Sequence, residues 1–411
     1  MADQRFDNLE PAQPHQAAAR GSALEVLRVA ARLGVTSFGG PVAHLGYFHQ
    51  EYVVRRKWLD ERTYADLVAL CQFLPGPASS ELGIAIGIGR AGVLGGVMAW
   101  LGFTLPSATA MVLFALIVRH TGALNAPWLH GLQIVAVAVV ALAVWQMGQR
   151  LASDRPRATI AVLAAVVILA WPTPLIQVAV IVGAGIVGWR LLPATAVEAE
   201  APRLAPFGRR LATGCWALYF GLLVGLPIAR QFVHDHTLAL VDSFYRAGAL
   251  VFGGGHVVLP LLQAAVVKPG WVTNGQFLAG YGAAQAVPGP LFTFAAYLGA
   301  IEKPAPNGII GGAVALIAIF LPSFLLVMGT LPFWNVLRTR ADLRSALEGI
   351  NASVVGLLLA ALYHPIWTTA ITSTTAFSLA LVSFALLAWW RVPPWMVVLG
   401  GALAAQLLLV R

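Results

Sequence analysis

The sequence predicts an all-α polytopic membrane protein made of two homologous repeats of inverted topology. Three observations lead to this prediction. Of its 411 residues, 59% are hydrophobic and only 10% are charged, whereas soluble domains carry about 25% charged residues. A pair of helix-breaking motifs occurs twice along the chain. Between the two copies lies an apolar segment that has no counterpart in the first copy, and one extra crossing of this kind reverses the second copy relative to the first.

Apolar segments fill most of the chain after a polar beginning. The first 21 residues lack the apolar core of a cleaved signal peptide. The segments that follow are long enough to cross about 30 Å of hydrocarbon, except that 158–171 is short and needs its neighbour to cover it. The expected spans are 92–118, 131–149, 158–171, 175–192, 211–229, 307–331, 345–363, 366–388 and 394–410.

The repeated motifs define the domains. Each copy has a Phe-Gly-Gly motif followed by a Pro-Gly-Pro motif, and the second copy lies 213 or 214 residues after the first. The motifs are Phe38-Gly39-Gly40-Pro41 with Pro75-Gly76-Pro77, and Phe252-Gly253-Gly254-Gly255 with Pro288-Gly289-Pro290. The predicted parts are a tail at 1–21, a first repeat at 22–192, a polar cytoplasmic linker at 193–210, a connecting transmembrane helix at 211–230 and a second repeat at 231–411.

Loop charge supports the inversion. Arginines follow the span 131–149 in the first repeat, but in the second repeat they precede the matching span 345–363. Cytoplasmic loops carry an excess of Lys and Arg, so the two matching helices point in opposite directions. The repeats are then related by a pseudo-two-fold axis in the membrane plane, and the N-terminus is expected in the cytoplasm.

The motifs are expected to break helices within the membrane. Glycine lets the backbone leave helical geometry, and proline suits the first turn of a new helix. We favour re-entrant hairpins at 22–48, 64–90, 240–262 and 276–301 over broken full spans, because irregular backbone at membrane depth must be buried in protein or line a cavity. Kinks that only allow tight helix packing are the alternative.

The breaks also suggest an anion site. A helix that starts at Pro-Gly-Pro presents unpaired N–H groups, and hydroxyls follow at Ser79, Ser80 and Thr293. Arg32 and Arg246 each lie six residues before a Phe-Gly-Gly motif, so the pseudo-two-fold could bring them together to clamp a tetrahedral dianion. The alternative for each arginine is an interfacial position with its side chain extended to lipid headgroups.

Proton coupling needs a group that titrates. His44 and His256 follow the two Phe-Gly-Gly breaks and are candidates, although each histidine could instead be a neutral hydrogen-bonding side chain. Glu81 follows the hydroxyls of the first Pro-Gly-Pro motif, but Phe294 occupies the matching position in the second repeat.

Other functions lack support in the sequence. The chain has no phosphate-binding GxxxxGK[ST] motif, so a gradient or a partner subunit must supply any driving force. Cys71 and Cys215 have no metal-ligand spacing. The net charge of +9 is better explained by cytoplasmic loops than by nucleic-acid binding. No HExxH or GxSxG motif suggests an enzyme, and no metal or cofactor is expected.

The paired motifs, including Phe38 to His44 and Gly253 to Pro260, resemble the signature of the chromate ion transporter (CHR) superfamily in its long, two-domain form. The resemblance covers nearly the whole chain from about residue 22. It implies export of chromate from the cytoplasm across a bacterial inner membrane, chromate resistance, and opposed topology of the halves. Relatives often have an amide at the position of Glu81, which counts against this residue as the coupling carboxylate.

Several points stay open at this stage. Chromate is nearly isosteric with sulfate, so sulfate or another oxyanion is an alternative cargo. A membrane scaffold or subunit without transport activity is the alternative of a different class. We expect alternating access driven by a proton or charge gradient, and the sequence leaves a homodimer open.

Overall fold

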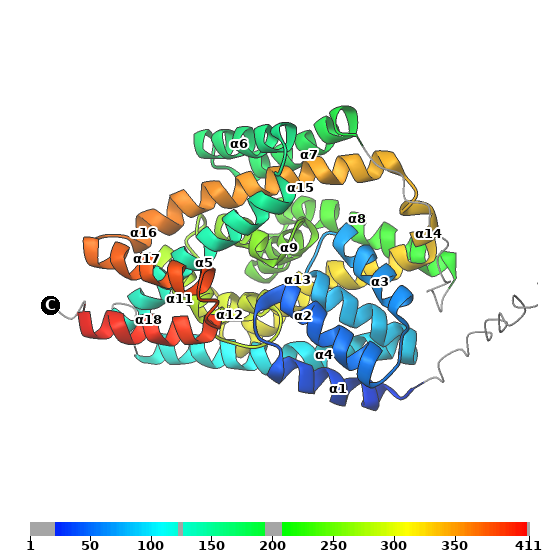
Figure 1. Ribbon diagram of the computed structural model, residues 1–411, viewed down its shortest axis with the longest axis horizontal. Helices are drawn as coiled ribbons and strands as arrows, with labels where there is room; N and C mark the ends of the chain where they lie inside the picture. The colour runs from blue at the N-terminus through cyan, green and yellow to red at the C-terminus, as the bar shows by residue number, and fades with distance from the viewer. Residues whose placement is uncertain (1–20, 122–125, 194–207, 409–411) are drawn as a thin grey trace, which may run out of the picture.

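A computed structural model describes residues 21–121, 126–193 and 208–408, so nearly all of the predicted tail and linker lie outside the described residues. Every regular element in the described part is helical (Figure 1). Five helices in this part are long and apolar enough to cross a membrane. The predicted all-α polytopic membrane fold is thereby confirmed.

Helix α8 (Arg209–Phe232) divides the described helices into two halves of the chain. The first half contains α1 (Ala23–Thr36), α2 (Gly40–Phe48), η1 (His49–Arg55), α3 (Glu61–Phe73), α4 (Ala78–Thr121), α5 (Pro127–Leu151), α6 (Arg155–Ala170) and α7 (Pro174–Leu191). Helix α8 connects the halves. The second half contains α9 (His236–Ala249), η3 (Gly255–Val257), α10 (Val258–Val266), α11 (Asn274–Ala284), η4 (Leu291–Thr293), α12 (Phe294–Ile301), α13 (Gly308–Thr330), η5 (Leu331–Phe333), α14 (Trp334–Leu337), α15 (Ala341–Ala361), η6 (Leu362–Trp367), α16 (Thr368–Ala370), α17 (Thr374–Ala388) and α18 (Pro394–Leu408).

The helices break at the predicted motifs. Glycines at the four breaks have positive φ: Gly39, Gly40, Gly76, Gly253, Gly254 and Gly289. Helix α4 changes direction once more at Ala91 and Gly92, where the backbone angles are not helical. Its first part therefore completes a hairpin with α3, and the rest forms a long span.

One expected span is wrong. The segment 366–388 is not continuous, because η6 and α16 end at Ala370 and a new helix begins at Thr374. The Ser373 side chain accepts a hydrogen bond from the backbone N–H of Ala376 and caps this new helix. Six Ser or Thr residues lie between Thr368 and Thr375, so hydroxyls that can cap a new helix are available where the expected span breaks.

In the first half, the broken helices start and finish at one end of the molecule. The N–H of Gly21, just before α1, donates to the carbonyl oxygen of Arg90, 3.0 Å away. The Arg90 guanidinium forms an ion pair with Glu25 at 3.3 Å and lies 4.9 Å from the ring centroid of Trp58. Trp58 itself lies in the loop between α2 and α3. These contacts agree with re-entrant hairpins rather than broken full spans.

In the second half, the start of α9 and the end of α12 are also held together beside a tryptophan, but by a histidine and a glutamate. Trp271, at the position matching Trp58, lies in the loop between α10 and α11. The His236 ring lies 4.5 Å from the Trp271 ring, and His236 Nε2 lies 3.2 Å from Glu302 Oε2. The N–H of Lys303 donates to the carbonyl oxygen of Trp271 at 3.1 Å. A titratable pair thus occupies the place that an arginine and a carboxylate occupy in the first half.

Long helices of each half pack against the other half. Helix α5 packs against α17 and α18, and α15 packs against α6 and α7, as the upper part of Figure 1 shows for α15. Glycines permit close crossings: a Cβ on Gly131 would lie 2.5 Å from the carbonyl oxygen of Gly401, and one on Gly188 would lie 2.5 Å from that of Ser345. The reciprocal exchange makes the two halves one packed unit.

The breaks themselves are joined across the halves. The N–H of Gly76 donates to the carbonyl oxygen of Val251 at 2.8 Å, and the N–H of Gly289 donates to that of Ser37 at 2.9 Å. Each Pro-Gly-Pro turn is therefore bonded to the residue that precedes the Phe-Gly-Gly motif of the other half. This pairing brings all four breaks to the centre of the molecule.

Replacing Gly289 by alanine tests the central packing. We expect Gly289→Ala to lower the melting temperature of the detergent-purified protein. A Cβ there would lie 2.8 Å from Ser107 Oγ, and alanine at a φ of +93° costs about 1–2 kcal/mol. Gly46→Ala is the matched control, because a Cβ at Gly46 meets no heavy atom within 4 Å. Equal melting temperatures for the two variants would contradict the proposed role of Gly289.

The His236–Glu302 pair predicts a pH dependence of stability. Burial raises the pKa of Glu302 to about 8 and lowers the pKa of His236 below its ordinary value of 6.5. Between about pH 7.5 and 8 the folded protein therefore retains a proton on Glu302 that the unfolded chain has lost, while His236 is almost entirely neutral in both states. The contribution of Glu302 to stability then falls as pH rises through this window.

We expect Glu302→Gln to reduce this decline, measured as melting temperature against pH in detergent. Glu348→Gln, at a carboxylate whose partner is Arg157 and not a histidine, is the control and should keep the wild-type profile. A Glu302→Gln profile parallel to that of the wild type would refute the assignment.

Candidate functional site

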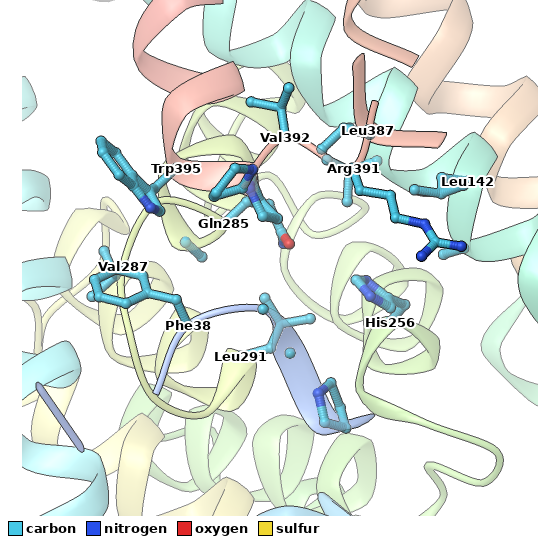
Figure 2. Close-up of a pocket in the computed structure, with 18 of the residues that line it drawn as sticks. Phe38, Leu142, His256, Gln285, Val287, Leu291, Leu387, Arg391, Val392 and Trp395 are labelled. Atoms are coloured by element: carbon cyan, nitrogen blue, oxygen red, sulfur yellow. The ribbon is translucent and has the colours of Figure 1, made fainter. Parts of the chain in front are cut away.

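A cavity of about 560 Å³ lies at the meeting point of the breaks (Figure 2). It is bounded by the first Phe-Gly-Gly break, the second Pro-Gly-Pro break, α5 and the α17–α18 loop. The lining residues are Phe38, Gly39, Gly40, Pro41, Tyr47, Val139, Leu142, Ala143, Gln146, His256, Ala284, Gln285, Val287, Gly289, Leu291, Leu387, Arg391, Val392, Pro393, Pro394 and Trp395.

The polar groups of this central cavity are cationic or neutral. Arg391 and His256 lie on the same side in Figure 2, and Gln285 projects into the space beside them. Gln146 on α5 adds a second amide, and none of the described lining residues is acidic. The cavity is therefore suited to an anion, because a guanidinium and amide N–H groups are hydrogen-bond donors.

The chain holds Arg391 in a defined loop. Its φ of +52° is uncommon for a residue other than glycine. The N–H of the next residue, Val392, donates to the carbonyl oxygen of Leu386 at 3.0 Å and closes the turn at the end of α17. Pro394 then starts α18. The guanidinium thus projects from a constrained turn rather than from a helix face.

His256 is also held in place. Its Nδ1 lies 2.6 Å from the hydroxyl oxygen of Tyr281, a buried residue of α11. The nearby Gln285 has a buried Nε2 atom without a hydrogen-bond partner in the described part of the chain. One fixed histidine and one amide with unused donor capacity therefore face the cavity.

The structure brings only some of the predicted site residues into this cavity. Five of them line it: Gly39, Gly40, Pro41, His256 and Gly289. Pro75, Gly76 and Pro77 are buried elsewhere in the centre. Gly253, Gly254, Gly255, Pro288 and Pro290 adjoin the breaks but are not among the lining residues.

The three predicted hydroxyls do not reach the central cavity. Ser79 Oγ lies 3.2 Å from Nδ1 of His44, and both side chains are buried. The hydroxyl of Thr293 donates to the carbonyl oxygen of Pro290 at 2.9 Å. Ser80 is buried as well. The expectation that these groups surround the same space is corrected, because their helices turn them into the protein interior.

The expected arginine clamp is not formed either. Arg32 is exposed on α1 and does not line the central cavity, whereas Arg246 lines a different cavity. Arg246 also forms an ion pair with Asp242, one helical turn earlier, at 2.8 Å. The helical register of α1 points Arg32 outward, so the pseudo-two-fold does not bring the two guanidinium groups together.

Glu81 occupies a separate, fully buried position. In the described part of the chain neither carboxylate oxygen has a hydrogen-bond partner that meets normal geometry. A Cβ on Gly76 would meet Oε1 of Glu81 and would lie 2.9 Å from Oγ of Ser323, so a hydroxyl from the other half lies beside the carboxyl. His44 Nε2 is likewise buried without a partner in the described residues.

Sequence reasoning missed Arg391, Gln146 and Gln285. Arg391 follows two tryptophans and precedes two prolines, which suggested only a loop between spans. The signal available was an arginine between rigid, apolar neighbours, where a flexible solvated loop would contain polar residues. Gln285 did carry a signal, because Gln72 matches it three residues before the other Pro-Gly-Pro motif. Gln146 carried none, because it lies in a continuous apolar helix pattern.

Comparison with known proteins gives consistent matches. The family model described as Chromate transporter matches residues 24–189 and 238–406. A chromate transport protein of Pseudomonas aeruginosa is 30% identical over 338 residues, which are 80% of this chain and 77% of that protein. A chromate transport protein of Cupriavidus metallidurans is 26% identical, covering 87% and 85% of the two chains. A probable chromate transport protein of Synechococcus elongatus is 26% identical, covering 80% and 81%. No solved structure matches the chain.

Arg391 provides a test of the central cavity. We expect Arg391→Gln to weaken binding of radiolabelled sulfate to the purified protein by about 10- to 100-fold, because a charge-assisted hydrogen bond contributes about 1.5–3 kcal/mol. Arg28→Gln, at an exposed arginine of α1, is the control. Wild-type affinity in Arg391→Gln together with lost affinity in Arg32→Gln would instead favour the two-arginine clamp.

Proposed function

This chain belongs to the chromate transporter family, and on that basis we propose that it exports chromate from the cytoplasm by alternating access and confers chromate resistance. The observation that carries the proposal is the central cavity, where breaks from both halves meet around Arg391 and His256 and where no described lining residue is acidic. We propose two inverted repeats, 22–192 and 231–411, joined by a cytoplasmic linker at 193–210 and a connecting helix at 211–230.

Chromate fits the chemistry of the central cavity. The volume of about 560 Å³ lies within the range of small-molecule sites and leaves room for water around a tetrahedral dianion. Arg391 supplies a full positive charge, and the amides of Gln146 and Gln285 supply further donors. Exposed backbone at Gly39 allows close approach by the anion.

The position of the cavity supports loading from the cytoplasm. Its α5 residues run from Val139 to Gln146, in the C-terminal part of that helix. Arg150 lies at the end of α5, and the arginine-rich loop after it is expected in the cytoplasm. An anion bound here would be taken from the cytoplasm, as export requires. The membrane is then the bacterial inner membrane, with the N-terminus in the cytoplasm.

An asymmetry between the halves supports alternating access. The second Pro-Gly-Pro motif borders the cavity through Gly289, whereas the first is buried. In transporters with inverted repeats, access alternates when the repeats rock against each other around a central site. We propose that the reverse arrangement exposes the first Pro-Gly-Pro motif toward the other side of the membrane.

We propose Glu81 as the group through which a proton gradient acts. It is completely buried beside Gly76, at the break that would have to move. An ionised carboxylate without a partner at this depth is costly, so movement of this break would be sensitive to proton binding. A charge gradient alone is the alternative source of energy.

Sulfate is the second candidate substrate, because it is a tetrahedral dianion of nearly the same size and the same donors would bind it. Both candidates predict a transporter and not an enzyme. A scaffold function would leave the central cavity without a role.

Chromate flux into proteoliposomes under imposed pH and voltage gradients tests the proposal. We expect flux with the purified protein alone, and we expect Glu81→Gln to lose the component driven by pH. Glu348→Gln, at a carboxylate that pairs with Arg157, is the control and should keep that component. Flux of sulfate that chromate does not inhibit would favour sulfate as the cargo, and no flux of either anion would favour a scaffold.

A further inference from the structure

We propose that a second cavity, bounded by α7, α8, α9 and α10, binds a tetrahedral oxyanion through Arg230, Arg246 and Lys268. Its volume is about 380 Å³. Its position on the exit route rests on the proposed function, whereas the binding chemistry does not. We call it the basic cavity.

The charges in the basic cavity do not balance. Three cationic side chains line it, and Asp242 is the carboxylate that contacts two of them. Asp242 Oδ2 lies 2.7 Å from Arg230 and 2.8 Å from Arg246. Three positive charges and one negative charge leave a surplus of about two, which a bound dianion would neutralise.

The ion pairs leave donor capacity facing the cavity. The Asp242 side chain is only 1% exposed, whereas each arginine side chain is 34% exposed. Asp242 therefore acts as a buried anchor that orients two guanidinium groups. Because each guanidinium is partly exposed, N–H groups that do not contact Asp242 remain open to the cavity. Each guanidinium has five N–H donors, so an anion can bind without displacing Asp242.

A purely structural ion pair explains less. One arginine would be enough to neutralise Asp242, yet two arginines converge on the same carboxylate oxygen, and Lys268 lines the same cavity. Gln177 and Ser243 add polar groups to the wall, and apolar side chains such as Leu261 and Ala264 form much of the rest. Lys268 is exposed and both arginines are partly exposed, so a dissolved anion can reach these donors and form charge-assisted hydrogen bonds with them.

The basic cavity adjoins the Phe-Gly-Gly break of the second half, on the side away from the central cavity. Leu250, two residues before Phe252, lines the basic cavity, whereas His256, just after the break, lines the central cavity. The break therefore separates the two spaces. Arg230 lies in the last turn of α8, at the opposite end from Arg209 and Arg210, which adjoin the expected cytoplasmic linker. An anion released past the break would reach the basic cavity before leaving on the far side.

Two sources could supply the tetrahedral anion: free oxyanion, or the phosphate of an anionic lipid. A thiol placed in the wall distinguishes them. Ala265, on α10, is half-buried and lines the cavity, whereas both native cysteines are buried. We would measure the rate at which a methanethiosulfonate reagent modifies Ala265→Cys in detergent, with increasing sulfate.

We expect sulfate to slow the modification, and we expect Arg246→Gln or Arg230→Gln to raise the half-protective sulfate concentration at least 10-fold. Arg28→Gln should leave it unchanged. Vesicles of phosphatidylglycerol that protect without sulfate, in a manner dependent on Arg246, would support the site with lipid phosphate as its source. Protection by neither anion, or protection unchanged in both arginine variants, would overturn the proposal. Each variant is first compared with the parent by melting temperature. Absence of chromate flux would overturn the proposed function without affecting this assay.

Discussion

The structure depends on backbone hydrogen bonds between the helix breaks of one half and those of the other half. An unpaired backbone group in hydrocarbon costs several kcal/mol, so a broken helix needs a partner for its free N–H and carbonyl groups. Here the Gly76 N–H bonds to Val251, and the Gly289 N–H bonds to Ser37. Each half supplies the partner that the other half lacks. Neither pair of hairpins can therefore keep its geometry without the other.

This mutual dependence explains the remaining packing. Each half also contains a Leu-Pro-Ser sequence, which ends at Ser107 and Ser323. These two serines lie against the Pro-Gly-Pro glycines of the opposite half. The long helices α5 and α15 then extend from the centre into the other half. A duplicated sequence thus forms one interleaved unit, in which the breaks of each half are packed against helices of the other half.

The sequence was sufficient to locate the helix breaks, which occur in both halves. It was insufficient to predict which side chains reach the central cavity. Glycine and proline act on their own backbone, so the four breaks could be located from Phe-Gly-Gly and Pro-Gly-Pro. The outward position of Arg32 depends on the rotation of α1 about its axis, and the shared contact of Arg246 and Arg230 with Asp242 depends on how α8 packs against α9. Arg391 reaches the central cavity because α17 and α18 pack on α5 of the other half. No local pattern encodes these long-range contacts.

The two halves differ in the side chains that hold the ends of their hairpins together. Fixed charges, Glu25 and Arg90, close the first pair of hairpins, whereas His236 and Glu302 close the second pair. An arginine stays charged at all physiological pH values, but burial raises the pKa of Glu302 to about 8. The two pairs of hairpins therefore respond differently to protons, although a tryptophan takes part in the closing contacts of both.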